Sequence, residues 1–416
     1  MEDIIDLGLP STTPKIIKVI GVGGGGGNAV NYMYRTGIHD VNFVVCNTDS
    51  KALADSPVPV RLQLGKEGLG AGNRPARARQ AAEETIDAIR DMLDDGTKMV
   101  FITAGMGGGT GTGAAPVIAH EAKEKGILTV GIVTIPFRFE GNKKIDQALD
   151  GVEAMRKEVD ALLVINNERL REIYPGLTIR SAFEKADNTL SVAARSIAEI
   201  ITMHGIINLD FQDVGTVLRD GGVALMSTGY GEGEGRITKA IEEALHSPLL
   251  NKNDVYNSKK ILVSITFAAD ENDENSNELL MEEMNEVHDF MSSFSDDVET
   301  KFGLSTDATL GDKVKVTILA TGFGINAVDG MAEKLEADAE EDAKRNKEKQ
   351  EENEERRSQY YGFSNERGVK KHFYRIFTFQ PDDIDDEELI ALVEATPTVR
   401  RTKEMLSDMK NRSKNK

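Results

Sequence analysis

Two glycine-rich segments carry the clearest chemical signal in the sequence. The first spans residues 21–28 (GVGGGGGN), and the second spans residues 105–113 (GMGGGTGTG). Each follows a short apolar run and precedes residues with helical periodicity. The N-terminus of a helix binds anions through free backbone N–H groups, and glycine lets a phosphate approach the backbone closely. One such loop is typical of dinucleotide-binding folds, whereas two loops indicate a polyphosphate held from two sides.

The first segment alone leaves another interpretation open. Gly21, Gly23 and Gly26 fit the G-x-G-x-x-G pattern, and acidic Asp49 follows the next apolar run. That combination would suit a nicotinamide-dependent dehydrogenase. The second glycine segment counts against this class, because a dinucleotide fold needs only one. The sequence has no GxxxxGK[ST] motif, so we expect backbone dipoles and a magnesium ion to balance the phosphate charge.

A pair of acids, Asp210 and Asp213, stands three residues apart in the segment 208–213 (NLDFQD). Acids at this spacing can cap the helix that follows them. They can also orient and polarise a water molecule that attacks a phosphate. The His residues are scattered without metal-ligand spacing, and Cys46 falls in an apolar run where a buried, inert thiol is expected.

Composition excludes several classes of protein. The chain of 416 residues has a net charge of -20, which argues against general nucleic-acid binding. Its single Cys excludes an intramolecular disulfide and a Cys-rich zinc site. No apolar run approaches the ~20 residues that cross a bilayer. Together these features favour a protein of the reducing cytoplasm.

Short β-branched runs alternate with helical stretches from residue 15 to residue 177. The expected strands cover 16–22, 41–47, 98–104, 127–135 and 161–166, and the expected helices cover 77–95 and 113–126. Near-continuously apolar strands lie in parallel sheets that helices cover on both faces. The pattern therefore predicts a Rossmann-like, doubly wound α/β domain.

A long helix is expected over residues 179–204, with Gly205 as its C-terminal cap. An α+β region follows it, with expected strands at 223–229, 259–269 and 313–323 and expected helices at 236–247 and 277–294. Residues 332–357 are mostly charged and contain neither Pro nor Gly. They predict either a solvated helix or a disordered linker, and we favour the linker.

Five motifs occur in the order seen in the FtsZ family, bacterial cell-division GTPases related to tubulin. They are GVGGGGGNAVNYM (21–33), GLGAG (68–72), GGGTGTGAAPVIA (107–119), FEG (139–141) and NLDFQD (208–213). The sequence resembles this family over residues 14–325. The resemblance implies binding of GTP and GDP, with magnesium accompanying the nucleotide. It further implies GTP-dependent polymerisation into head-to-tail filaments of the midcell division ring, and hydrolysis at the contact between subunits.

The resemblance also assigns a role to each matching position. Gly23, Gly24 and Asn28 would approach phosphate and guanosine, and Ala71 and Gly72 would lie near the terminal phosphate. The phosphates would be held by Gly107, Gly108, Gly109, Thr110 and Gly111. Glu140 would accept hydrogen bonds from the ribose, Lys144 would supply charge, and Asn167, Phe183 and Asp187 would clamp guanine. Asn208, Asp210 and Asp213 would form the catalytic segment, with no protein metal site.

These implied roles cannot all be filled by one subunit. Asp210 follows Asp187 by 23 residues, which is about 30 Å at helical rise. If Asp187 lies at the nucleotide, Asp210 cannot reach the phosphates of its own chain. One subunit's acids must then meet the next subunit's nucleotide, and such a heterologous contact propagates as a filament.

The resemblance organises the chain into consecutive segments. They are an N-terminal arm (1–14), a GTP-binding domain (15–177), a central helix (178–204), a catalytic-loop segment (205–222), an α+β domain (223–330), a charged linker (331–380) and a docking tail (381–416). The tail contains TPTVRR (396–401), a loose match to the peptide that binds membrane anchors and other division proteins in the family. The alternative is that the basic residues of 399–416 bind anionic lipid or nucleic acid directly.

Two functional alternatives to a cell-division GTPase remain. One is a scaffold that binds GTP and hardly hydrolyses it. The other is a tubulin-like filament that partitions plasmids. The linker and the docking-like tail favour cell division, with no specific nucleic-acid partner and only indirect contact with the membrane.

Overall fold

The computed structural model describes residues 15–325 with gaps at 39, 175, 204, 247–254, 270–277 and 296, together with 328, 331, 334, 387–395, 405 and 406. The chain divides into two compact units, Met1–Ala339 and Glu340–Lys416. The expected arm (1–14), nearly all of the charged segment (332–357) and the TPTVRR segment (396–401) lie outside the described residues. Within the second unit the described helix is α15 (Glu387–Glu394).

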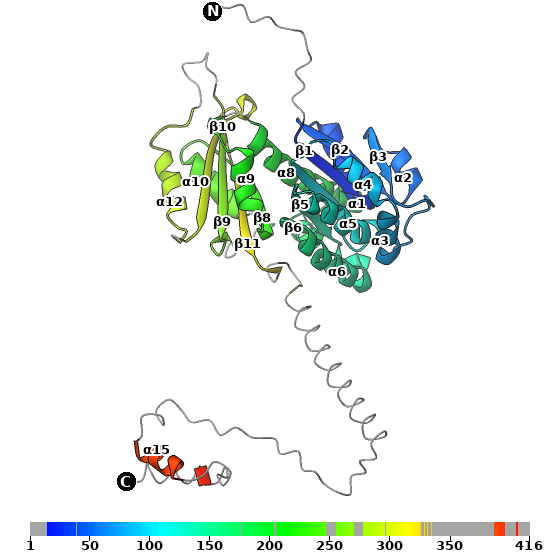
Figure 1. The fold of residues 1–416 in the computed structure, drawn as a ribbon. Helices are drawn as coiled ribbons and strands as arrows, with labels where there is room; N and C mark the ends of the chain where they lie inside the picture. The colour runs from blue at the N-terminus through cyan, green and yellow to red at the C-terminus, as the bar shows by residue number, and fades with distance from the viewer. Residues whose placement is uncertain are drawn as a thin grey trace, which may run out of the picture. The chain divides into compact units, whose positions relative to one another are not determined.

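Six parallel strands form the first part of the sheet in Met1–Ala339 (Figure 1). They are β1 (Ile17–Val22), β2 (Val41–Asn47), β3 (Val60–Gln63), β4 (Met99–Gly105), β5 (Leu128–Ile135) and β6 (Ala161–Asn166). Their spatial order is β3-β2-β1-β4-β5-β6. The expected buried parallel strands are confirmed, since the apolar residues of β1, β4 and β5 are buried along their lengths.

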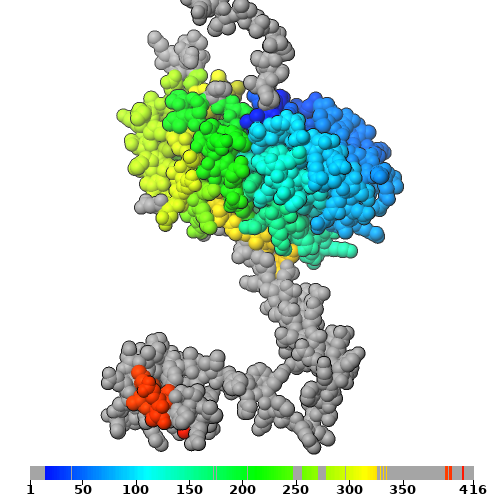
Figure 2. Space-filling model, in the orientation of Figure 1, coloured from blue at the N-terminus to red at the C-terminus, as the bar shows by residue number. Residues whose placement is uncertain are grey.

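The second group of strands continues the same sheet. It comprises β7 (Gly205–Ile207), β8 (Gly222–Glu232), β9 (Lys260–Phe267), β10 (Glu299–Thr306) and β11 (Lys313–Phe323), and the order after β6 is β8-β11-β9-β10-β7. β6 and β8 join the two groups through the pairing of Ala161–Leu163 with Gly222–Ala224. Figure 2 shows the corresponding surface, where the blue-to-cyan residues run without a break into the green ones. The strand patterns in the sequence did not reveal this junction.

Helices cover both faces of the sheet. One face carries α1 (Gly23–Thr36), α2 (Ser50–Ala54), α8 (Ile179–Thr202) and α9 (Phe211–Leu218). The other carries α3 (Pro75–Glu84), α4 (Ile86–Met92), α5 (Thr110–Glu124), α6 (Asn142–Glu158), α10 (Arg236–Leu245) and α12 (Met284–Met291). Each face has its own apolar cluster, and each cluster contains residues of both strand groups. The doubly wound α/β class expected from the sequence is therefore confirmed.

Three expected helices have different bounds. The single helix expected at 77–95 is wrong: it breaks into α3 and α4 at Thr85, whose hydroxyl donates to the carbonyls of Ala81 and Ala82. Such a side-chain bond to the preceding turn competes with continuation of the helix. The long helix is confirmed, but Gly205 does not cap it. Gly205 lies in β7, where an added Cβ would stand 2.0 Å from the Leu304 carbonyl oxygen.

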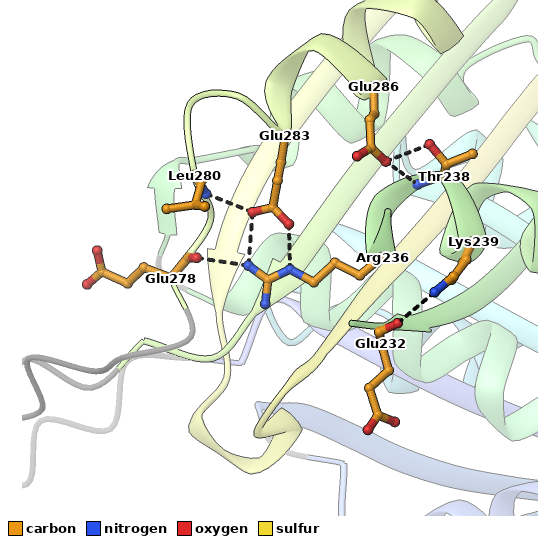
Figure 3. Close-up of polar contacts among 8 residues, drawn as sticks. All are labelled: Glu232, Arg236, Thr238, Lys239, Glu278, Leu280, Glu283 and Glu286. Carbon is orange, nitrogen blue, oxygen red and sulfur yellow. Dashed lines mark hydrogen bonds and ion pairs between the residues drawn. The ribbon is translucent and has the colours of Figure 1, made fainter. Parts of the chain in front are cut away.

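The helix expected at 277–294 begins later, as α12. Before it, the Glu283 carboxylate accepts from the Leu280 N–H at 2.8 Å and from the Arg236 guanidinium at 2.7 and 3.0 Å (Figure 3). Arg236 also donates to the Glu278 carbonyl, and Glu286 accepts from the Thr238 backbone and hydroxyl. These contacts tie α10 to α12 and fold the preceding segment into a turn instead of a helix.

Candidate functional site

The two glycine segments follow neighbouring parallel strands, β1 and β4, and so lie at the same carboxyl edge of the sheet. β1 pairs with β2 on one side and with β4 on the other, so the order of the strands reverses between β1 and β4. Ligands of open α/β sheets bind at such a switch point. α1 begins at Gly23 directly after β1, and α5 begins at Thr110 shortly after β4. Two helix N-termini therefore open at the same place.

Part of the glycine content serves the packing of the two segments against the protein itself. A Cβ on Gly26 would stand 2.1 Å from the Thr103 carbonyl oxygen, and a Cβ on Gly111 would stand 2.6 Å from the Gly105 carbonyl oxygen. Gly113 is equally constrained, with 2.0 Å to the Pro75 carbonyl oxygen. Gly26 and Gly111 thus allow the two segments to approach the end of β4, and Gly113 allows α5 to approach α3.

Other glycines face open space. A Cβ on Gly24 or Gly72 would meet no protein atom within 4 Å, and on Gly108 the nearest atom is 4.0 Å away. Neither Gly24 nor Gly108 has a positive φ, so the backbone conformation does not require glycine at either position. Open space beside a bare backbone is the cradle that a phosphate requires. Gly23 (φ 74°) and Gly107 (φ 88°) instead hold conformations that favour glycine.

Side chains fix the second glycine segment from three directions. The Thr48 and Thr110 hydroxyl oxygens lie 2.7 Å apart, and the Thr112 hydroxyl accepts from the Gly107 N–H at 2.9 Å. Gln147 donates to the carbonyls of Gly107 and Gly108, both at 3.0 Å. An added Cβ on Gly109 would stand 2.9 Å from Cβ of buried Ala71. Contacts within the protein thus hold the segment in shape.

A second part of the site lies between α1 and α8. Asn28 and Asp187 line one hollow of about 520 Å³, together with Asn31, Tyr32, Arg35, Ser181, Glu184, Lys185 and Asn188. Burial, and then the neighbouring Glu184 carboxylate, raises the pKa of Asp187 to about 7. The structure therefore places in one hollow two of the residues, Asn28 and Asp187, that the resemblance assigned to guanosine from different motifs.

An aromatic and an amide side chain, Phe183 and Asn167, are the other groups that the resemblance assigned to guanine. Phe183, one turn before Asp187 on α8, packs edge-to-face on Phe137 with ring centroids 5.2 Å apart, and Phe139 stacks on Phe137 at the same separation. Asn167 opens α7 (Asn167–Ile173), and its buried Oδ1 has no hydrogen-bond partner within the described structure. A buried, unpaired acceptor is costly unless a ligand donates to it, so Asn167 fits a ligand with N–H groups.

Glu140 and Lys144 form an ion pair near the same strand ends. Glu140 closes the 3₁₀ turn η1 (Arg138–Glu140), where its carboxylate accepts from the Phe137 N–H at 2.9 Å. It also receives the Lys144 ammonium at 2.5 Å. A carboxylate has further lone pairs, so Glu140 can still accept a hydrogen bond from a hydroxyl group. The Lys144 ammonium is engaged with Glu140, which balances its charge within the protein.

The acid pair lies on a different part of the molecule. Asp210 caps α9 by accepting from the Asp213 N–H at 2.9 Å, and Asp213 accepts from the Asp210 N–H at 3.2 Å. Asn208 Oδ1 accepts from the Gly205 N–H at 2.7 Å. The helix-capping interpretation of the sequence is thus confirmed for both acids. Capping leaves the remaining lone pairs of these exposed side chains available for other contacts.

One subunit does not bring the acids to the glycine segments. Asp187 lies in the first half of α8, and the helix continues to Thr202 before the chain reaches β7 and Asp210. At helical rise the stretch from Asp187 to Thr202 alone spans about 22 Å. Glu199, near the far end of α8, is tied to Lys315 of β11 at 2.8 Å, which fixes that end against the second strand group.

Other sequence expectations concern metal sites, the thiol and the dehydrogenase. No group of three or more His, Cys, Asp or Glu in the described residues is arranged to hold a metal ion. Cys46 is buried, and burial raises the pKa of its thiol to about 12, as expected for an inert residue. Asp49, the acid of the dehydrogenase pattern, caps α2 by accepting from the backbone of Lys51 and Ala52. Among the described helices, none has the length and apolar character to cross a membrane.

Sequence reasoning missed three contributors. Thr48 follows β2 and meets Thr110, but a lone Thr carries no motif. Gln147 reaches the second glycine segment only because α6 packs beside α5. Lys301 of β10 pairs with Asp213 at 3.0 Å. The last two contacts join residues far apart in sequence, and no local pattern marks them.

Comparison with known families matches most of this architecture. Residues 16–175 match the GTPase domain of the Tubulin/FtsZ family, and residues 222–324 match the FtsZ family C-terminal domain. Residues 371–416 match a further FtsZ C-terminal model. The first match contains both glycine segments, and the second contains β8, β9, β10 and β11.

Individual relatives agree with these matches. A cell division protein FtsZ of Porphyromonas gingivalis is 49% identical over 415 residues, covering 96% of this chain and 88% of that protein. One from Coxiella burnetii is 45% identical over 337 residues, covering 80% and 85%. A solved structure of an empty FtsZ dimer of M. jannaschii has a TM-score of 0.66 and 37% identity, covering 74% of this chain and 88% of that one. The chain therefore belongs to the FtsZ branch of the tubulin/FtsZ family.

Proposed function

We propose that this chain is the cell-division GTPase of its cell, that it polymerises head to tail, and that each hydrolytic site is completed by the neighbouring subunit. The observation that carries the proposal is the separation of the two halves of the site. The glycine cradle lies at the carboxyl ends of β1 and β4, while Asp210 and Asp213 lie beyond the far end of α8. A phosphate bound in the cradle has no carboxylate of this pair within reach.

The phosphates would lie across the N-termini of α1 and α5. Gly24 and Gly108 leave room for them, and Gly23, Gly107, Gly109, Thr110 and Gly111 form the surrounding backbone. Ala71 and Gly72 would stand beside the terminal phosphate, because Ala71 packs closely against Gly109 of the second glycine segment. Preformed backbone N–H groups stabilise the charge that develops on the transferred phosphoryl group.

Guanine recognition is assigned to the hollow between α1 and α8. Guanine presents an N1–H and an exocyclic amine, and both can donate to the ionised Asp187 carboxylate. Adenine presents an acceptor at N1, and two acceptors, N1 and the Asp187 carboxylate, would repel each other. Asn167 Oδ1 and the Asn28 side chain are available for further contacts, Phe183 for packing, and Glu140 for the ribose hydroxyls.

Asp210 and Asp213 of the next subunit would orient the attacking water, and Asn208 would shape their turn. The exposed Ile206 and Ile207 precede these acids, 70% and 44% exposed respectively, and would be covered in the subunit contact. The described residues offer no carboxylate cluster for a metal. Magnesium would therefore be held by the phosphate oxygens of the nucleotide, where it neutralises charge.

The same proposal includes the location and partners. Residues 371–416 match the FtsZ C-terminal model, which supports a docking role for the tail. We assign membrane anchors and other division proteins to that tail, and we place the polymer in the cytoplasm at the division site, where it forms the midcell ring. Direct binding of the basic 399–416 segment to lipid is the alternative, and co-sedimentation of a 385–416 peptide with anionic vesicles would distinguish the two.

The shared site predicts that turnover depends on protein concentration. Phosphate release per molecule is expected to be near zero below a threshold concentration and to rise steeply above it, because isolated subunits lack the acids. The measurement is phosphate release from GTP with magnesium while protein concentration is increased. Constant activity per molecule from the lowest concentration would contradict the shared site. Binding of GTP without release at any concentration would instead favour the non-hydrolysing scaffold.

The raised pKa of Asp187 predicts that GTP affinity depends on pH. In the free protein this carboxyl has a pKa of about 7. Guanine N–H donors favour its ionised form, so binding lowers this pKa and releases a proton. Affinity is therefore expected to fall as the pH drops below 7, by up to about tenfold per pH unit. Equilibrium binding of GTP between pH 5.5 and 8.5 checks this. Asp187→Asn should bind more weakly at pH 8 with a flat profile, and a flat wild-type profile would contradict the assignment.

A further inference from the structure

Lys301 stands beside the acid pair, although it comes from a strand nearly ninety residues later in the chain. Its ammonium lies 3.0 Å from Asp213 Oδ1, and the two side chains are 32% and 30% exposed. The carboxylates of Glu299, on the same strand, and of Asp210 also attract this ammonium electrostatically. Lys301 is therefore the positive group among three carboxylates at this end of the described unit.

The fold fixes the position of Lys301 relative to the acids. An added Cβ on Gly303 would stand 2.5 Å from Leu209, so the backbone of β10 lies directly against the residue that precedes Asp210. Leu209 is buried, and β10 also pairs with β7 through Leu304 and Ile207. Residues i and i+2 of a strand share one face. Lys301 and Gly303 therefore face the acid segment together.

The Asp213 carboxylate is held at both oxygens. Oδ2 accepts from the Asp210 N–H at 3.2 Å, and Oδ1 receives the Lys301 ammonium. Without the lysine only the longer bond would remain, and the carboxylate could rotate. The pKa of Asp213 lies below its usual value, first because of the hydrogen bond from Lys301, while partial burial works in the opposite direction. Removing the lysine would therefore take away the main group that favours the ionised form of this carboxylate.

We propose that Lys301 is a positioning residue for GTP hydrolysis: its ammonium fixes the Asp213 carboxylate of one subunit in the orientation that acts on the neighbouring subunit's nucleotide. This inference rests on the proposed role of Asp213. It adds a residue from the C-terminal domain to the hydrolytic half-site. A carboxylate already oriented before the subunits meet needs no reorganisation when it contacts water and phosphate.

The test uses the full-length chain with Lys301→Met, Lys301→Gln and Lys301→Arg. Lys260→Met is the matched control. Lys260 also contacts α9, but at the C-terminal end of that helix, where it donates to the carbonyls of Thr216 and Arg219. We would measure GTP affinity, the threshold concentration for assembly, the melting temperature, and kcat and KM above the threshold. Lys301→Met and Lys301→Gln are expected to lower kcat about tenfold at unchanged KM, GTP affinity and threshold. Lys301→Arg should restore most of the rate.

Several outcomes would overturn this inference. An unchanged kcat in Lys301→Met would show that Asp213 needs no orientation from the lysine. If turnover in Lys301→Met falls only as far as assembly or melting temperature falls, and Lys260→Met shows the same losses, then Lys301 has a structural role and does not position Asp213. Failure of Lys301→Arg to restore the rate would also reject positioning through the ion pair. If Asp213→Asn itself retains full turnover, the proposed function fails instead, and the two failures are thereby distinguished.

Discussion

Replacing Asp213 with Asn is expected to lower GTP turnover at least about 100-fold, the range seen when a group that handles the attacking nucleophile is removed. GTP binding should not change, because the hollow between α1 and α8 lies near the start of α8, whereas Asp213 follows the end of that helix. Asn keeps an oxygen that can accept from the Asp210 N–H, so most of the helix cap remains. What is lost is the charge that orients water and the ion pair with Lys301.

Phosphate release well above the assembly threshold measures this effect. Equilibrium GTP binding and the melting temperature show whether the variant is otherwise intact. Asp289→Asn provides the matched control, since Asp289 is an exposed acid on α12 outside the proposed site. Normal turnover in Asp213→Asn would remove this acid from the mechanism. A loss of GTP binding of similar size would show that the two halves of the site are not separate.

Adding a methyl group to the glycine segments is expected to have opposite consequences at different positions. Gly24→Ala and Gly108→Ala place the methyl in space that the free protein leaves open, so folding should be unaffected. The same methyl would meet the phosphates, and overpacking of this kind costs about 1–3 kcal/mol, or roughly 5- to 150-fold in GTP affinity. In Gly26→Ala the methyl instead meets the Thr103 carbonyl oxygen at 2.1 Å. That variant should lose about 2–5 °C in melting temperature.

GTP binding and thermal unfolding measured on the same preparations separate the two effects. Gly176→Ala serves as the control, because its methyl also meets no atom within 4 Å and Gly176 has no assigned contact. It should change neither quantity. Wild-type affinity in both Gly24→Ala and Gly108→Ala would show that phosphate does not occupy the open space above these residues. An unchanged melting temperature in Gly26→Ala would contradict the tight approach of α1 to β4.

Much of the fold could be predicted from local patterns. The parallel strands and the long helix are confirmed because their apolar periodicity reflects burial on both faces of a sheet. The prediction failed where one side chain overrode the pattern. The hydroxyl of Thr85 divides α3 from α4, and the carboxylate of Glu283 turns the chain before α12. Helical periodicity continues through both positions, so it could not reveal either break.

The candidate site shows the same division. The glycine spacing predicted phosphate chemistry, but it could not distinguish Gly26, which packs against Thr103, from Gly24, which faces open space. That difference depends on how closely α1 approaches β4. The acids were identified from their motif, yet their pairing with Lys301 arises from β10, which is remote in sequence. The assigned roles of these residues stay predictions until the variants are measured.

The sequence by itself determined that this chain has a doubly wound α/β fold with two glycine segments that each precede a helix. The separation of the acid pair from these segments was expected only once the resemblance placed Asp187 at the nucleotide. Backbone freedom at glycine, apolar periodicity and chain length along a helix are local properties, so they can be read from consecutive residues. Only the tertiary structure decided that β6 and β8 join all the strands into one sheet and that Asn28 and Asp187 line one hollow. It also decided that Lys301 holds Asp213. Each of these depends on contacts between segments far apart in the chain, which form only when the elements pack.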